Sequence, residues 1–264
     1  MYQRIACTVV VSLLLILWPA TPAVAEEEAK NLAYLEELFV FPDKSEEYEG
    51  LIREFKEVAT TYGFPYQFNS YRLDNLRYLL IWTVPGTAGI DKVNTAWLAT
   101  AEKWGEEASA AWSKKLFATM THWESSVWTP RPDLAYYPEN AADEFKFVFR
   151  GRLLIKLGHQ QDVEEIFKEY IKLYNEHKVP HAWNTIEGYV GVENPTLAFI
   201  EWSASPGSYW MRQDEMMKDD EFSKKAEALW MKMLPHLREF KRDTGWYMED
   251  MSYLPKKAEA AGEK

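Results

Sequence analysis

Cysteine is almost missing from this sequence. Cys7 is the single one in 264 residues, and it lies in an apolar stretch at the N-terminus. The rest of the chain therefore has no disulfide framework, no thiolate ligands for zinc and no cysteine nucleophile. Its stability must come from a hydrophobic core, and a chain of this length can form two domains with cores of ordinary size.

Positive charge is also in short supply. The chain has 30 Lys and Arg against 41 Asp and Glu, which gives a net charge of -11 and a pI near 5.1. This balance argues against nucleic acid or an anionic membrane surface as a partner. The sequence also lacks a phosphate-binding loop, a dinucleotide fingerprint and a catalytic-serine motif. No His-x-His, Glu-x-x-His or two-His-one-carboxylate spacing is visible, so no metal site is expected.

The one long apolar run, residues 5–18, follows Arg4 and precedes Ala23-Val24-Ala25. This order is typical of a signal peptide with a small-x-small cleavage site. We therefore expect residues 1–25 to be removed and the mature chain to be periplasmic or secreted, without membrane association. The run is short for a membrane span, which needs about 20 residues. An uncleaved N-terminal anchor is the alternative.

A long internal repeat is present. Residues 51–69 match residues 166–184, and each copy has an amphipathic run, then an apolar residue and proline, then an aromatic before Asn. Downstream, Ile81-Trp82-Thr83 matches Glu201-Trp202-Ser203. Two long copies indicate a duplicated domain, because a solenoid needs three or more short units. We expect one repeat over residues 26–138, a second over 139–255, and a flexible tail over 256–264.

Each repeat shows the pattern strand, helix, strand, strand, helix, strand. The strands are expected at residues 35–41, 66–71, 77–84 and 125–129, and then at 145–156, 182–190, 196–203 and 245–253. One long helix is expected after Pro85-Gly86 and another over residues 221–241, with Trp97, Trp104 and Trp112 facing the sheet. This predicts an α+β fold: two ferredoxin-like βαββαβ units, in tandem, that form a closed eight-stranded pseudo-dimeric barrel.

With this topology the chain resembles the dimeric α+β barrel superfamily in a single-chain form. That superfamily includes antibiotic-biosynthesis-type monooxygenases, NIPSNAP-like proteins and haem proteins of the chlorite dismutase type. The resemblance implies a small-molecule ligand, with cofactor-free monooxygenase or isomerase chemistry on an apolar or aromatic compound. Haem is the alternative cofactor, and His122 or His236 would then be the axial ligand, since it comes from the helical layer. A non-catalytic binding or scaffold module is the third possibility. The sequence carries no signal for an oligomeric state.

The two copies diverge on their central hairpins, and this divergence predicts the site. Glu201 interrupts an apolar strand, and a carboxylate there must be paired, protonated or solvated in a cavity. We expect Trp183 opposite Glu201, Phe68 opposite Ile81, and His181 as the acid–base partner of Glu201. The predicted site has Glu201 and His181 as catalytic residues, with Trp183, Thr185, Ser203 and Asn184 as ligand-binding residues. Alternatively, Glu201 faces solvent or pairs with Lys156, and Asn184, like Asn69, satisfies backbone groups.

Overall fold

The structure is a computed structural model that describes residues 31–139, 141 and 146–255. The expected signal peptide and C-terminal tail lie outside the described residues. The first half contains β1 (Asn31–Val40), α1 (Ser45–Tyr62), β2 (Phe68–Leu73), β3 (Arg77–Pro85), α2 (Ala88–Trp104), α3 (Glu106–Ala118) and β4 (Met120–Pro130). The second half contains β5 (Phe147–Ile155), α4 (Gln160–Glu176), β6 (Trp183–Val190), β7 (Thr196–Ser203), α5 (Pro206–Met217), α6 (Asp220–Met233) and β8 (Leu237–Tyr247).

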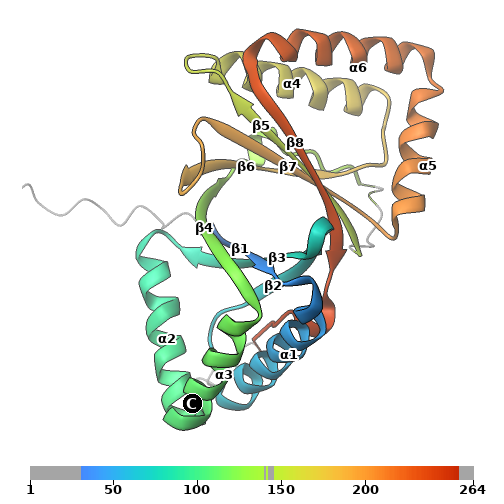
Figure 1. Cartoon of the computed structure of the whole chain (residues 1–264). Helices are drawn as coiled ribbons and strands as arrows, with labels where there is room; N and C mark the ends of the chain where they lie inside the picture. The colour runs from blue at the N-terminus through green and yellow to red at the C-terminus, as the bar shows by residue number, and fades with distance from the viewer. Residues whose placement is uncertain (1–30, 140, 142–145, 256–264) are drawn as a thin grey trace, which may run out of the picture.

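The eight strands close into one antiparallel barrel in the order β1-β3-β2-β8-β5-β7-β6-β4. The two halves therefore have the same internal order, β4-β1-β3-β2 and β8-β5-β7-β6, and they join where β2 meets β8 and where β4 meets β6. Figure 1 shows the helices of the two halves on opposite sides of this barrel. The predicted fold class, an eight-stranded α+β barrel, is confirmed. Among the described residues, no helix combines the length and the apolar character that crossing a membrane requires.

Strand alternation divides the core into three layers. One layer lies between the first-half sheet and its helices, and Phe55, Trp82 and Trp112 belong to it. A second lies under α4 and α6. The third fills the barrel interior, where Leu35 and Trp128 from the first half meet residues of the second half. Trp97 and Trp104 pack against the first layer, as predicted from their helical spacing.

Two predicted helices and the strand that follows one of them are corrected. The long helix of the first half is divided into α2 and α3 at Gly105, whose φ of +108° favours glycine. The helix predicted over residues 221–241 ends at Met233, because Pro235 has no N–H to continue it. Residues 237–247 then form β8, so the last strand starts well before the predicted residue 245.

The register of the first hairpin is also corrected. Phe68 lies opposite Trp82, not Ile81, whereas Trp183 lies opposite Glu201 as predicted. Trp82 therefore holds the position in the first half that Glu201 holds in the second. Ile81 packs inside the barrel. Matching Trp82 with Trp202 puts Ile81 at the position of Glu201, which is one residue off. A shift of one residue moves a side chain to the other face of a strand.

An ion network crosses the barrel interior and links the two halves. Asp243 on β8 pairs with Arg77 on β3, with Arg150 at 2.8 Å and with Arg152 at 3.1 Å on β5. Glu37 on β1 completes it at 2.6 Å from Arg77 and 3.3 Å from Arg150. Burial by itself raises the pKa of Asp243, but the surrounding guanidinium groups outweigh it, and the net pKa is lowered. The Asp243 carboxylate thus stabilises the closed barrel in its charged form.

We predict that Asp243→Asn lowers the free energy of unfolding by about 3 kcal/mol, because it removes the carboxylate shared by the buried Arg150 and the half-buried Arg77 and Arg152 and leaves them only Glu37. The folded-state pKa is below the unfolded value of about 3.9, so the contribution is complete above that pH and is lost as pH falls through the folded pKa. Urea denaturation at pH 7 and at pH 3 measures both effects. Glu47→Gln is the control, since its pair with Lys44 is exposed to solvent and should contribute little to stability. An Asp243→Asn variant as stable as this control would contradict the role of the network.

Candidate functional site

Glu201 lies on the face of β7 that is covered by the second-half helices. Its neighbours at every second position, Leu197 and Phe199, pack in the same layer, while Ala198 and Ile200 point into the barrel. The Glu201 residue is only 7% exposed. The alternatives of a solvent-facing Glu201 or a pair with Lys156 are therefore wrong: Lys156 instead donates to the Pro235 carbonyl at 2.7 Å.

Two side chains contact the Glu201 carboxylate. The Tyr209 hydroxyl donates to Oε2 at 2.5 Å, and His181 Nε2 lies 3.3 Å from Oε1. Tyr209 is positioned by α5, which begins with a capping box formed by Ser205 and Ser208. Burial raises the pKa of Tyr209, and the charge of Glu201 raises it further. Tyr209 therefore keeps its proton and acts as a donor.

His181 is fully buried, and its imidazole is poorly satisfied. Neither ring nitrogen has a hydrogen-bond partner of good geometry, although Nε2 is within ion-pair distance of Glu201. A buried polar group in this state costs about 1–3 kcal/mol. Buried polar groups are normally hydrogen-bonded, so an exception of this kind calls for an explanation. His181 and Glu201 are thus brought together as the sequence suggests, and their catalytic role stays a prediction.

A cavity of about 170 Å³ lies beside Glu201, between the sheet and helices α4 and α6. Six aromatic side chains line it: Phe167, Tyr170, Tyr174, Trp183, Phe199 and Trp230. Glu201 is the one acidic or basic residue of this lining. Burial raises the pKa of both Tyr170 and Tyr174, so their rings stay neutral. The cavity therefore offers apolar walls and one carboxylate.

Of the predicted residues, only Glu201 and Trp183 line this cavity; His181 contacts Glu201 without lining the cavity itself. Thr185 donates its hydroxyl to the Leu134 carbonyl at 2.7 Å, and Ser203 lies 2.6 Å from Ser208 in the cap of α5. Asn184 is on the opposite face of β6 and accepts a hydrogen bond from Tyr137. Asn184 lines a separate cavity of about 330 Å³ in the barrel interior, together with Asn69.

Tyr209 is the residue that sequence reasoning missed. It lies in α5, and the sequence pattern predicted no helix directly after Pro206. The comparison of the two copies also gave no signal for it, because α2 of the first half starts differently. The available hint was local: Ser205 followed by Pro206 is a helix-start signal, with Ser at the N-cap and Pro at the first helical position.

The first half has its own carboxylate under the helices, the half-buried Glu36 on β1. Trp82 Nε1 donates to Glu36 Oε2 at 2.9 Å, and burial raises the pKa of Glu36. Glu36 lines a cavity of about 280 Å³ with Trp97 and Trp112. The first half therefore also has a carboxylate in its helix-covered layer, although it does not come from β3. The two carboxylates come from different strands and have different partners.

The residues around the second-half cavity do not fit a haem. A cavity of about 150 Å³ holds one benzene ring, so about 170 Å³ is far too small for a porphyrin. The two expected axial ligands are elsewhere: His122 is exposed on β4, and His236 precedes β8 outside the cavity. His181, the one histidine nearby, already contacts Glu201.

Comparisons with known proteins support the fold. No protein-family model matches the sequence, and no curated protein matches it. Among solved structures, the chain is similar to a candidate monooxygenase from Fusobacterium nucleatum subsp. nucleatum (TM-score 0.54, 12% identity, 87% of this chain and 98% of that chain). It is similar to an anthrone oxidase-like protein (TM-score 0.53, 13% identity, 84% and 92%). It is also similar to a chlorite dismutase variant from Candidatus Nitrospira defluvii (TM-score 0.52, 10% identity, 85% and 94%). At these identities the comparison shows the shared barrel fold alone.

We predict that Tyr209→Phe destabilises the protein by about 2 kcal/mol, because a hydrogen bond to a charged carboxylate contributes about 1.5–3 kcal/mol. Tyr170→Phe is the matched control. Its hydroxyl donates to the neutral Ala226 carbonyl at 2.9 Å and should contribute about 1 kcal/mol. Urea denaturation of both variants at pH 7 measures the difference. Equal losses would mean that the Tyr209–Glu201 hydrogen bond is no stronger than one to a backbone carbonyl.

Proposed function

We propose that the second half binds a small, single-ring organic compound that carries one hydrogen-bond donor. The observation that carries this proposal is the lone carboxylate of Glu201 in an aromatic cavity of about 170 Å³. That volume matches one benzene-sized ring. The aromatic walls would pack on the ring, and Glu201 would accept the hydrogen bond of a hydroxyl or amino group.

The same arrangement suits base chemistry without a cofactor. A phenol has a pKa of about 10, far above that of a carboxylic acid. In the resting complex the phenol hydroxyl therefore keeps its proton. Glu201 would act as a general base in the transition state, when a C–H or O–H of the ligand becomes acidic. Return of that proton to another atom is an isomerisation. In the monooxygenase alternative, the deprotonated ring carbon would add dioxygen to give a hydroperoxide, and loss of water would leave a carbonyl there; the ligand supplies all four electrons, one oxygen atom stays on it and the other leaves as water.

Tyr209 and His181 would support this role of Glu201. Tyr209 holds the carboxylate in place from Oε2, and His181 lies beside Oε1. An isolated carboxylate in an apolar site would be costly, and these two contacts reduce that cost. We infer further that the two halves arose by tandem duplication, which supports specialisation of one copy, because the other can maintain the barrel.

We predict that 4-fluorophenol binds with its hydroxyl at Glu201, whereas fluorobenzene binds through its ring alone. Glu201→Gln should then weaken 4-fluorophenol binding about tenfold or more, the loss of one hydrogen bond to a charged group. Fluorobenzene binding should stay nearly unchanged. Fluorine NMR of the two ligands in titrations with the protein measures both constants.

Glu36→Gln is the matched control, since it removes the half-buried carboxylate that lines the first-half cavity. It should leave the binding of both ligands intact. If Glu36→Gln weakens 4-fluorophenol binding and Glu201→Gln does not, the ligand site is in the first half. If neither ligand binds, the second-half cavity is a packing feature, and a non-catalytic scaffold is the better account.

We also propose that the protein acts outside the cytoplasm, after removal of residues 1–25. The support is the apolar run followed by Ala23-Val24-Ala25. Mass spectrometry of the protein from its native host should give a chain that begins at Glu26. A chain that retains Met1 would contradict export by cleavage.

A further inference from the structure

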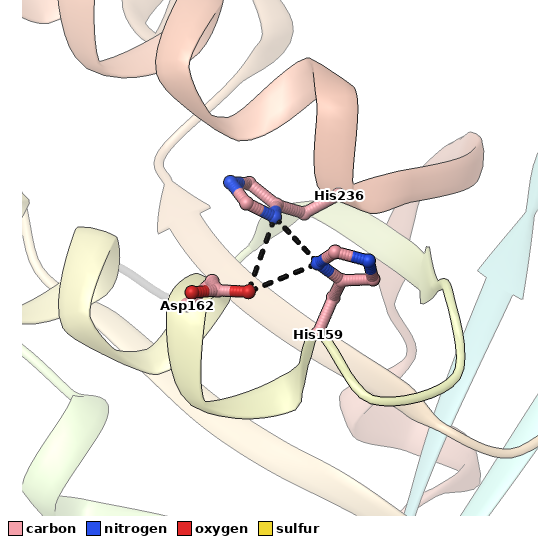
Figure 2. Close-up of side chains that lie close together, drawn as sticks. All are labelled: His159, Asp162 and His236. Carbon is pink, nitrogen blue, oxygen red and sulfur yellow. Dashed lines mark hydrogen bonds and ion pairs between the residues drawn. The ribbon is translucent and has the colours of Figure 1, made fainter.

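Three side chains converge on the surface of the second half, away from the Glu201 cavity. His159 precedes α4, Asp162 is in its first turn, and His236 precedes β8. His159 Nδ1 lies 2.9 Å from Asp162 Oδ2 and 2.9 Å from His236 Nδ1, and His236 Nδ1 lies 3.3 Å from Asp162 Oδ2. Figure 2 shows these three atoms facing one another at the centre of the group.

Hydrogen bonds alone satisfy this arrangement poorly. Each Nδ1 carries either one N–H or one lone pair in the ring plane. If both histidines donate to Asp162, their two nitrogens lie 2.9 Å apart and neither has a lone pair to accept a hydrogen bond from the other. If His159 donates to Asp162, it has no lone pair left for a proton from His236. One cation, in contrast, can accept a lone pair from all three atoms at once.

The size of the triangle matches a zinc-like ion. Zinc binds His nitrogen at about 2.0–2.1 Å and carboxylate oxygen at about 2.0–2.2 Å, so the ligand atoms of a tetrahedral site are about 3.4 Å apart. The observed separations are 2.9–3.3 Å. The circle through the three atoms has a radius of about 1.8 Å, so an ion about 1 Å above their plane would be about 2.05 Å from each, within the range for zinc.

The first half shows the same backbone with different side chains. The amide of Phe41 donates to the Thr119 carbonyl at 2.9 Å, as the amide of Lys156 donates to the His236 carbonyl at 2.8 Å. Lys44 and Glu47 hold the positions of His159 and Asp162, and Lys44 Nζ pairs with Glu47 Oε2 at 2.9 Å. The first half thus has a positive charge of its own here, the Lys44 ammonium. The second half has two imidazoles, which can be neutral, and one carboxylate.

We propose that His159, Asp162 and His236 bind a divalent transition-metal ion of the Zn²⁺ type. Two imidazoles and one carboxylate are a donor set that suits Zn²⁺ and its first-row neighbours. The exposure of Asp162 and His159, 49% and 42% for their side chains, leaves the remaining coordination positions to water. The ion joins the start of α4 to the start of β8, two segments 77 residues apart. The sequence did not predict it, because His236 is remote from the His-x-x-Asp pair.

The test is zinc binding by the untagged chain, measured by calorimetry after treatment with a chelator and dialysis. The wild-type protein should bind one equivalent, and Co²⁺ in its place should give visible d–d absorption. His236→Ala and Asp162→Asn should weaken binding about 100-fold or more, since even outer-shell partners contribute 10–100-fold. His159→Lys, which copies the Lys44–Glu47 pair, should abolish binding and keep the fold. Zinc should raise the melting temperature of the wild type and not of His159→Lys.

His177→Ala is the matched control. His177 Nδ1 lies 2.8 Å from Asp219 Oδ2, a His–Asp pair on the same half without a second histidine. It should bind zinc as the wild type does. The proposal is overturned if the wild type binds no zinc. It is also overturned if His236→Ala and Asp162→Asn bind zinc as tightly as the wild type. Loss of zinc in His177→Ala alone would place the ion at Asp219 and would also overturn it.

Discussion

Closure of the eight-stranded sheet is the constraint on which the rest of the structure depends. An open sheet has edges, and closing it removes them. Closure also gives every strand two distinct environments, the barrel interior and the helix-covered outside. Successive side chains alternate between them. This alternation places Glu201 and Trp183 under the helices and Asn184 inside the barrel, although Asn184 is the chain neighbour of Trp183.

The shared barrel lets the two halves differ in chemistry without differing in architecture. Under the helices, the first half places Glu36 from β1 next to Trp82, and the second places Glu201 from β7 next to Tyr209. At the start of the first helix of each half, Lys44 and Glu47 are replaced by His159 and Asp162. A fold fixes where side chains point, and function depends on which side chains are there. In this chain, the two candidate sites of the second half both occupy positions where the halves diverge.

The sequence was sufficient for the fold and for part of the site. The repeat around residues 51–69 and 166–184 predicts the barrel, and the pairing of Trp183 with Glu201 follows from strand alternation. It was insufficient where long-range geometry decides. The register of β3 depends on its pairing with both neighbours, so the Trp82–Trp202 match was one residue off. Tyr209 reaches Glu201 because α5 begins at Pro206, and His236 reaches His159 because α6 ends at Met233; neither helix boundary was predicted.

The central claim is that the cavity beside Glu201 is the ligand site. The most direct test is a crystal structure of the protein with 4-bromophenol, in which anomalous scattering locates the bromine. The account predicts a bromine peak among Phe167, Tyr174 and Trp230, with the phenol oxygen at hydrogen-bond distance from Glu201. A peak at Glu36 in the first half, or between Asn69 and Asn184 in the barrel interior, would contradict it.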